Sequence, residues 1–115
     1  MNLTRIIKEL QWDVVGGRNS LDREITGGYA SDLLSCVMAG AELGNIWVTL
    51  QAHPNVVAVA VLLELGGVVI TEGVQPDNVT LAKAEQEGMP LLSTKDDTYT
   101  VISKLAQLGI QGNAQ

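Results

Sequence analysis

Small polar residues follow several predicted strands and could form a ligand-binding rim. The candidate ligand-binding residues are Thr26, Gly27, Gly28, Thr49, Gln51, His53, Asn55, Thr71, Gly73, Thr94 and Lys95. Hydroxyl, amide and imidazole groups both donate and accept hydrogen bonds, and a glycine turn that leads into a helix leaves backbone N–H groups free for an anion. The alternative is that these residues only cap helices and satisfy turn amides.

The paired glycines Gly27 and Gly28 are predicted to turn the chain after a strand. Their surroundings, Ile25-Thr26-x-Gly28, recur as Ile70-Thr71-x-Gly73, so we expect the two turns to be built alike. In this hypothesis both loops present amides to an anionic ligand, with a contribution from Lys95.

Hydrophobic periodicity predicts helices that alternate with strands. The predicted helices are 3–11, 33–41, 54–65, 76–87 and 97–109, and the predicted strands are 12–15, 23–26, 45–51, 67–71 and 90–94. The segment 54–65 is rich in β-branched residues, but its length favours a helix. This order predicts an α/β fold, a single domain over 1–115 with a mainly parallel sheet and helices packed on it. The tail 111–115 is predicted to fray.

Helix ends are predicted from capping residues. Ser31 or Asp32 can cap the helix 33–41, Pro76 is placed in the first turn of its helix, and Gly88 lies just past that helix. Asp97 is interpreted as the N-cap of the last helix.

The strand-to-helix loops of a parallel sheet emerge at its carboxyl edge, where open α/β folds bind ligands. Thr49, Gln51 and His53 occupy alternate positions, so they project from one face as long as the strand persists. The loops are therefore predicted to converge on a shallow polar pocket.

Charge and hydropathy exclude two kinds of partner. The chain has 13 Asp+Glu against 7 Lys+Arg and a net charge of -6, without a basic cluster, so nucleic acid is not expected. The longest apolar run, Val56–Leu63, falls short of the roughly 20 residues that a membrane span needs. The charged N-terminus lacks the apolar core of a signal peptide, and we expect a cytoplasmic protein.

Catalytic signatures are missing from the sequence. It has neither a Walker loop nor G-x-G-x-x-G, and one His with one Cys cannot build a usual zinc site. Cys36 lies among apolar residues and is expected to be buried, which disfavours a Cys36–His53 nucleophilic pair. His53, before Pro54, is interpreted as a turn or helix-start residue. We therefore expect no enzyme activity, no cofactor and no metal.

Three stretches of the sequence form a recognisable set: "REITGG", "NIWVTLQAHPNVVAVAVLLELGGVVITEG" and "EGMPLLSTKDDTYTVISKL". Together they resemble the DRTGG domain, over about residues 12–108. The name-giving motif is degenerate, with Arg23-Glu24-Ile25-Thr26-Gly27-Gly28 in its place. The patterns W-V-T-x-Q-x-H-P-N and G-x-P-L-L-x-T-x-x-D-T-Y are more specific.

The resemblance implies a regulatory or interaction module that often dimerises. Similar domains occur in phosphotransacetylases and beside CBS domains, and they resemble the N-terminal domain of HPr kinase/phosphorylase, whose phosphate-binding loop this sequence lacks. The favoured hypothesis is a non-catalytic homodimer that senses a small anionic metabolite or docks a partner protein. The alternative is a small enzyme acting at the polar rim.

Overall fold

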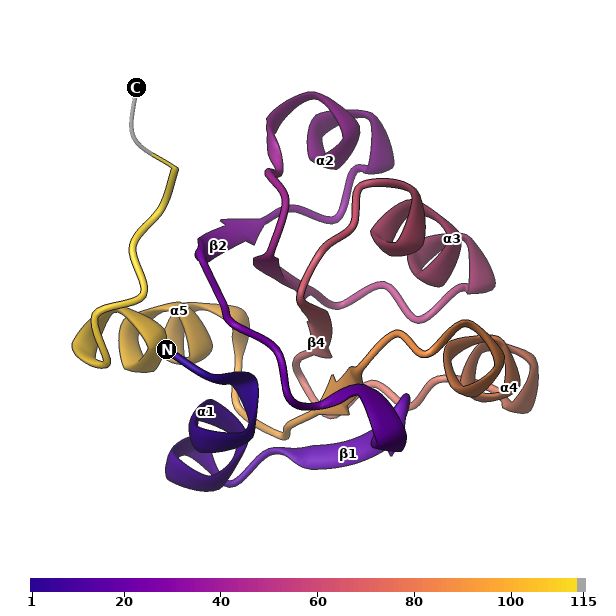
Figure 1. Cartoon of the computed structure of the whole chain (residues 1–115), viewed down its shortest axis with the longest axis horizontal. Helices are drawn as coiled ribbons and strands as arrows, with labels where there is room; N and C mark the ends of the chain where they lie inside the picture. Colours follow the sequence, from indigo (N-terminus) through magenta and orange to yellow (C-terminus); the bar gives the residue numbers. More distant parts are fainter. Residues whose placement is uncertain (114–115) are drawn as a thin grey trace.

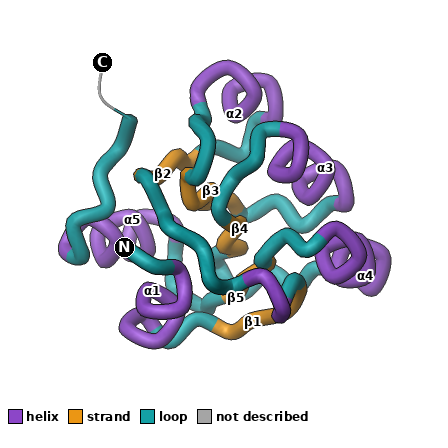
Figure 2. The backbone as a smooth tube through the Cα atoms, in the orientation of Figure 1, coloured by secondary structure: helices purple, strands orange, loops and turns teal. Residues whose placement is uncertain are grey.

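A five-stranded sheet runs through the molecule in the order β1-β5-β4-β3-β2 (Figure 2). In this computed structural model, which describes residues 1–113, the strands are β1 (Asp13–Gly16), β2 (Gly27–Ala30), β3 (Asn45–Thr49), β4 (Gly67–Ile70) and β5 (Leu91–Ser93). Strands β2 to β5 are parallel to their neighbours, and only β1 is antiparallel, against β5. The α/β fold with a mainly parallel sheet is confirmed.

Helices cover both faces of the sheet (Figure 1). One face carries α2 (Leu34–Gly40), α3 (Pro54–Leu62) and α4 (Asn78–Glu87), and the other carries α1 (Leu3–Leu10) and α5 (Thr98–Gln107). A short 3-10 turn covers Arg18–Ser20. No helix within residues 1–113 is long and apolar enough to cross a membrane.

Two apolar cores lie on the two faces of the sheet. Trp47 packs with α2, α3 and α4, whereas its neighbours Ile46 and Val48 pack with α1 and α5. Every residue of β3 is buried, as expected for a central strand covered on both faces. The β-branched segment after β3 is a helix as predicted, because it must cross from β3 to the parallel strand β4.

The second strand lies four residues later than predicted. Residues 23–26 form no strand of the sheet but contact the N-terminus, where Leu3 N–H donates to Arg23 O over 2.8 Å and Ile25 N–H to Met1 O over 2.9 Å. Gly27 instead opens β2 and pairs with Asn45 of β3. The predicted glycine turn is therefore wrong, and neither Gly27 nor Gly28 has a positive φ.

The predicted N-cap of α2, Ser31 or Asp32, is also wrong. Its N-cap is Leu33, which makes no side-chain capping bond. Ser31 Oγ accepts from Leu33 N–H over 3.1 Å, and the Asp32 carboxylate accepts bonds from the end of β3. The error follows from the wrong position of β2, because residues 31–33 form the loop between β2 and α2.

The later helix ends were predicted more closely. Asp97 is the N-cap of α5, and Gly88 ends α4 in the left-handed conformation. Pro76 precedes the N-cap Asp77 and so lies outside the first turn, contrary to prediction.

The C-terminal segment is docked where fraying was predicted. Gly28 N–H donates to Gln111 O over 2.9 Å, and Asn113 Nδ2 donates to Gly40 O and Asn45 Oδ1 over 3.0 and 2.9 Å. These bonds hold residues 111–113 beside β2. Residues 114–115 of the predicted tail lie outside the described residues.

Candidate functional site

The Thr26–Gly28 stretch lies at the amino ends of the strands, opposite the predicted rim. Thr26 Oγ1 donates to Leu43 O over 2.8 Å and accepts from Asn45 Nδ2 over 3.2 Å, which fixes the turn that enters β3. A Cβ on Gly27 would come within 2.9 Å of Gln111 O. The residues of this stretch therefore have structural contacts, and the stretch resembles the Thr71–Gly73 loop in sequence only.

Arg23 ties this stretch to two helices. Its guanidinium donates to Leu65 O over 3.1 Å and Gly88 O over 2.8 Å, just beyond the C-terminal ends of α3 and α4. Burial lowers the pKa of Arg23 below its usual value, and the side chain remains a cation. A positive charge at helix C-termini is stabilising, so Arg23 is a structural clamp.

The loops after β4 and β5 close on each other. Thr71 is fully buried, and its hydroxyl lies 2.7 Å from the Thr98 hydroxyl. Glu72 Oε2 accepts from Thr98 N–H over 2.9 Å at the start of α5. At this point the chain passes from α4 on one face of the sheet to α5 on the other, and open α/β sheets bind ligands at such a switch. In this protein, however, the carboxylate of Glu72 occupies the N-terminus of α5.

Backbone bonds complete this closure. Gly73 N–H donates to Thr94 O over 3.0 Å, and Glu72 N–H to Asp96 O over 2.8 Å. Thr94 Oγ1 accepts from Asp96 N–H over 3.1 Å. The interpretation that turn residues satisfy one another therefore describes Thr71, Gly73 and Thr94.

Lys95 borders a separate cavity of about 250 Å³ beside the end of α1. Thr94 also lines it, together with Asp13, and Lys104 Nζ forms a 2.7 Å ion pair with Asp96 there. The mixture of lysines and carboxylates gives this cavity no net preference for anions.

Three predicted residues do converge at the open half of the carboxyl edge. Gln51, His53 and Asn55 line a cavity of about 170 Å³ with Asp32, Leu34 and Val56, which we call the His53 cavity. Strand β3 ends at Thr49, so Gln51 and His53 extend from the following loop and not from the strand as predicted. The structure brings these three side chains to one cavity, whereas Thr71, Gly73, Thr94 and Lys95 of the predicted rim do not line it.

Asp32 is the polar residue of this cavity that sequence reasoning assigned only to capping. Its Oδ1 accepts from Thr49 Oγ1 over 2.7 Å and from Leu50 N–H over 2.9 Å. Oδ2 has no hydrogen-bond partner among residues 1–113. Thr49 is fully buried, and its hydroxyl holds the Asp32 carboxylate in place.

His53 is the N-cap of α3, which confirms it as a helix-start residue. Its Nδ1 accepts from Asn55 N–H over 3.1 Å, so the bonded tautomer carries its proton on Nε2. Within the described part of the chain, Nε2 has no partner. The ring is therefore held in place while one donor stays available.

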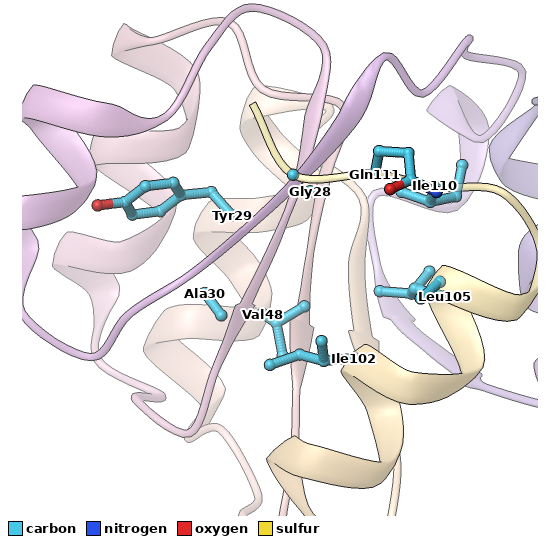
Figure 3. A pocket seen from close by; sticks show the side chains of 10 residues that line it. Gly28, Tyr29, Ala30, Val48, Ile102, Leu105, Ile110 and Gln111 are labelled. Atoms are coloured by element: carbon cyan, nitrogen blue, oxygen red, sulfur yellow. The ribbon is translucent and has the colours of Figure 1, made fainter. Parts of the chain in front are cut away.

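An apolar groove lies between β2 and α5, on the face of the sheet that carries α1 and α5 (Figure 3). It measures about 180 Å³, and we call it the β2–α5 groove; its apolar lining includes Gly28, Ala30, Val48, Ile102, Leu105, Ala106 and Ile110. Tyr29 points away from α5 in Figure 3, and its hydroxyl donates to Cys36 O over 3.1 Å. None of the lining residues is charged.

Cys36 is exposed on α2, so the prediction that it is buried is wrong. The seven-residue helix turns Val37 into the core instead. Among residues 1–113, no group of three or more His, Cys, Asp or Glu side chains could hold a metal ion.

Residues 6–108 match the model of the DRTGG domain. The chain belongs to the DRTGG domain family. A search of curated proteins gave no match. A similar solved structure is that of the CBS and DRTGG domains of the regulatory region of Clostridium perfringens pyrophosphatase, complexed with its activator diadenosine tetraphosphate.

The TM-score of that comparison is 0.71 at 14% identity, over 92% of this chain and 46% of the other. This DRTGG domain therefore spans less than half of the chain it resembles. At this identity the likeness shows the fold.

Proposed function

We propose that this DRTGG domain is a non-catalytic regulatory module that binds a small metabolite in the His53 cavity. The observation that carries the proposal is that Asp32 and His53, both exposed to solvent, are each fixed by bonds to the protein and keep one polar atom without a partner in residues 1–113. Side chains held in advance by a supporting shell are typical of binding sites. The family resemblance and the composition lead us to propose a cytoplasmic module.

The alternative of a small enzyme has less support. The hydroxyl nearest a carboxylate is that of Thr49, which donates to Asp32 but is fully buried. A nucleophile must reach its substrate, and this one is covered by the strand and loop around it. Cys36 does not line the His53 cavity.

The charge of Asp32 restricts how an anionic metabolite would bind. A phosphate or carboxylate placed inside the cavity would face this carboxylate, which is unfavourable. We infer that the neutral part of the ligand enters the cavity and contacts Gln51, His53 and Asn55. Thr94 and Lys95 would contact only a ligand long enough to cross the edge.

A thermal-shift screen against nucleotides and phosphorylated metabolites tests this proposal, because a ligand that binds only the native state raises its stability. The informative variant is His53→Asn, which keeps an N-cap acceptor and removes the Nε2 donor. We expect a hit whose shift is lost in His53→Asn and kept in the exposed control Gln86→Ala on α4. A hit that both variants bind equally would place the ligand elsewhere.

We also propose a homodimer that covers the β2–α5 groove with a second copy. Two chains of net charge -6 repel each other, so a surface without charges is the more favourable place for them to meet. The groove has no charged lining residue, and Ile102 at its border is 43% exposed. Interface cores are depleted of charge in the same way.

Light scattering at micromolar concentration would test the dimer. We expect twice the 12.2 kDa monomer mass for the wild type and for Val79→Glu, which changes an exposed apolar residue on α4. Ile102→Glu should give the monomer mass. A monomeric wild type would contradict the dimer and leave the groove for a partner protein.

A further inference from the structure

We propose that the His53 cavity recognises a vicinal diol, as in the ribose of a nucleoside or in a free sugar. This inference rests on the proposed ligand-binding function of the same cavity. It concerns the chemical group that Asp32 and His53 would select.

Asp32 and His53 offer one acceptor and one donor. Oδ2 of Asp32 can accept from a hydroxyl, while Nε2–H of His53 can donate to one. Each hydroxyl of a diol both donates and accepts, so two adjacent hydroxyls can satisfy both groups. The amides of Gln51 and Asn55 border the same cavity and can bond to the remaining oxygens.

Anionic and cationic groups fit these atoms less well. A phosphate or carboxylate would meet the negative charge of Asp32. The start of α3 offers it no free amide, because Pro54 has no N–H, Asn55 N–H donates to His53 Nδ1 and Val56 N–H donates to His53 O. An ammonium group could pair with Asp32, but it has no lone pair to accept from His53.

The size and walls of the cavity suit a sugar ring. Its volume of about 170 Å³ is below the roughly 300–1,000 Å³ of pockets that hold whole drug-sized ligands. Leu34 and Val56 supply apolar wall, against which the C–H face of a ring can pack. We infer that the ring enters and the rest of the ligand remains outside.

The test is an NMR titration of the ¹⁵N-labelled chain with adenosine, 2′-deoxyadenosine, 2′,3′-dideoxyadenosine and methyl β-ribofuranoside. Adenosine should shift the amide signals of residues 32 and 50–56. Loss of one hydroxyl should weaken binding about tenfold, as expected for a hydrogen bond to a charged group. Asp32→Asn keeps an Oδ1 acceptor for Thr49 and Leu50 but removes the carboxylate, and it should weaken adenosine binding by a similar factor.

The probes separate the possible sources and the possible failures. Equal binding of adenosine and the riboside supports a sugar site, and adenosine binding alone supports a nucleoside site. Glu87→Gln, an exposed charge change on α4, should bind as the wild type does. If the deoxy compounds bind as tightly as adenosine, or if only metabolites without a diol shift these signals, the diol is wrong and the cavity remains a ligand site. If none of these probes and no metabolite of the wider screen shifts them, both proposals fail.

Discussion

The Arg23–Gly28 stretch and the Gln51–Asn55 loop contain similar small polar residues but use them in different ways. In the first, Arg23 and Thr26 bond to backbone carbonyls, and Gly27 packs against Gln111. In the second, His53 caps α3 with one nitrogen and leaves the other without a partner in residues 1–113. A polar residue type therefore marks a site only when the fold leaves some of its bonding capacity unused.

The loops after β4 and β5 show the same principle at the carboxyl edge itself. They follow parallel strands, as the Gln51–Asn55 loop does, but Thr71 bonds to Thr98 and Glu72 bonds to the start of α5. We therefore expect changes in the closed regions to affect folding, and changes in the open loop to affect ligand binding.

The largest expected effect separates the two adjacent glycines. A Cβ on Gly27 would lie 2.9 Å from the backbone oxygen of Gln111, whereas one on Gly28 would have its nearest neighbour at 3.6 Å. Gly27→Ala should therefore lower the free energy of unfolding by about 1–3 kcal/mol, and Gly28→Ala should change it by less than about 0.5 kcal/mol. Urea denaturation measures both, with hydrogen exchange of the Gly28 amide as a local report. Equal stability of the two variants would contradict a packing role for Gly27.

A somewhat smaller effect is expected where the closed loops meet. Thr71→Val leaves the Thr98 hydroxyl without its partner and should cost about 1–2 kcal/mol of unfolding free energy. The double variant Thr71→Val/Thr98→Val removes both hydroxyls, so its cost should be less than the sum of the single costs. Additive costs in denaturation would mean that the two hydroxyls do not interact. Ligand binding at the His53 cavity should be unchanged in Thr71→Val.

The fold was predictable because most of its signals are local. Periodicity and length gave the helix from Pro54, and caps such as Asp97 and Gly88 marked the ends of later helices. The position of β2 was not predictable in this way. Residues 23–26 and 27–30 can both be extended, and the choice depends on contacts with Met1, Leu3 and Asn45, which are distant in sequence.

The same error accounts for the part of the site that was missed. Once β2 is placed at Gly27–Ala30, Asp32 follows its carboxyl end, next to the loop that contains His53. Gln51, His53 and Asn55 were predictable because they directly follow β3, whose strand pattern is strong. The closure of Thr71, Gly73 and Thr94 was not, because it depends on bonds between two loops.

The smallest expected effect concerns pH and compares the helix caps. The pKa of Asp97 is lowered mainly by its interaction with the Thr100 side chain and, next, by the bond from the Thr100 backbone N–H. The pKa of Asp77 is lowered mainly by the bond from the Thr80 backbone N–H. Because the folded pKa is depressed, both carboxylates stabilise the fold above the unfolded value of about 3.9, and this stabilisation is lost as the pH falls through the folded pKa.

Asp97→Asn retains an N-cap acceptor without the titrating charge. Its stability, measured by urea denaturation between about pH 6 and pH 2.5, should fall less steeply in acid than that of the wild type. His53, the cap of α3, also contributes to the lowered pKa of Asp77, so His53→Asn should itself make the loss of stability in acid slightly less steep. If Asp97→Asn and the wild type lose stability in parallel as the pH falls, the Asp97 carboxylate does not contribute to the acid sensitivity of the fold.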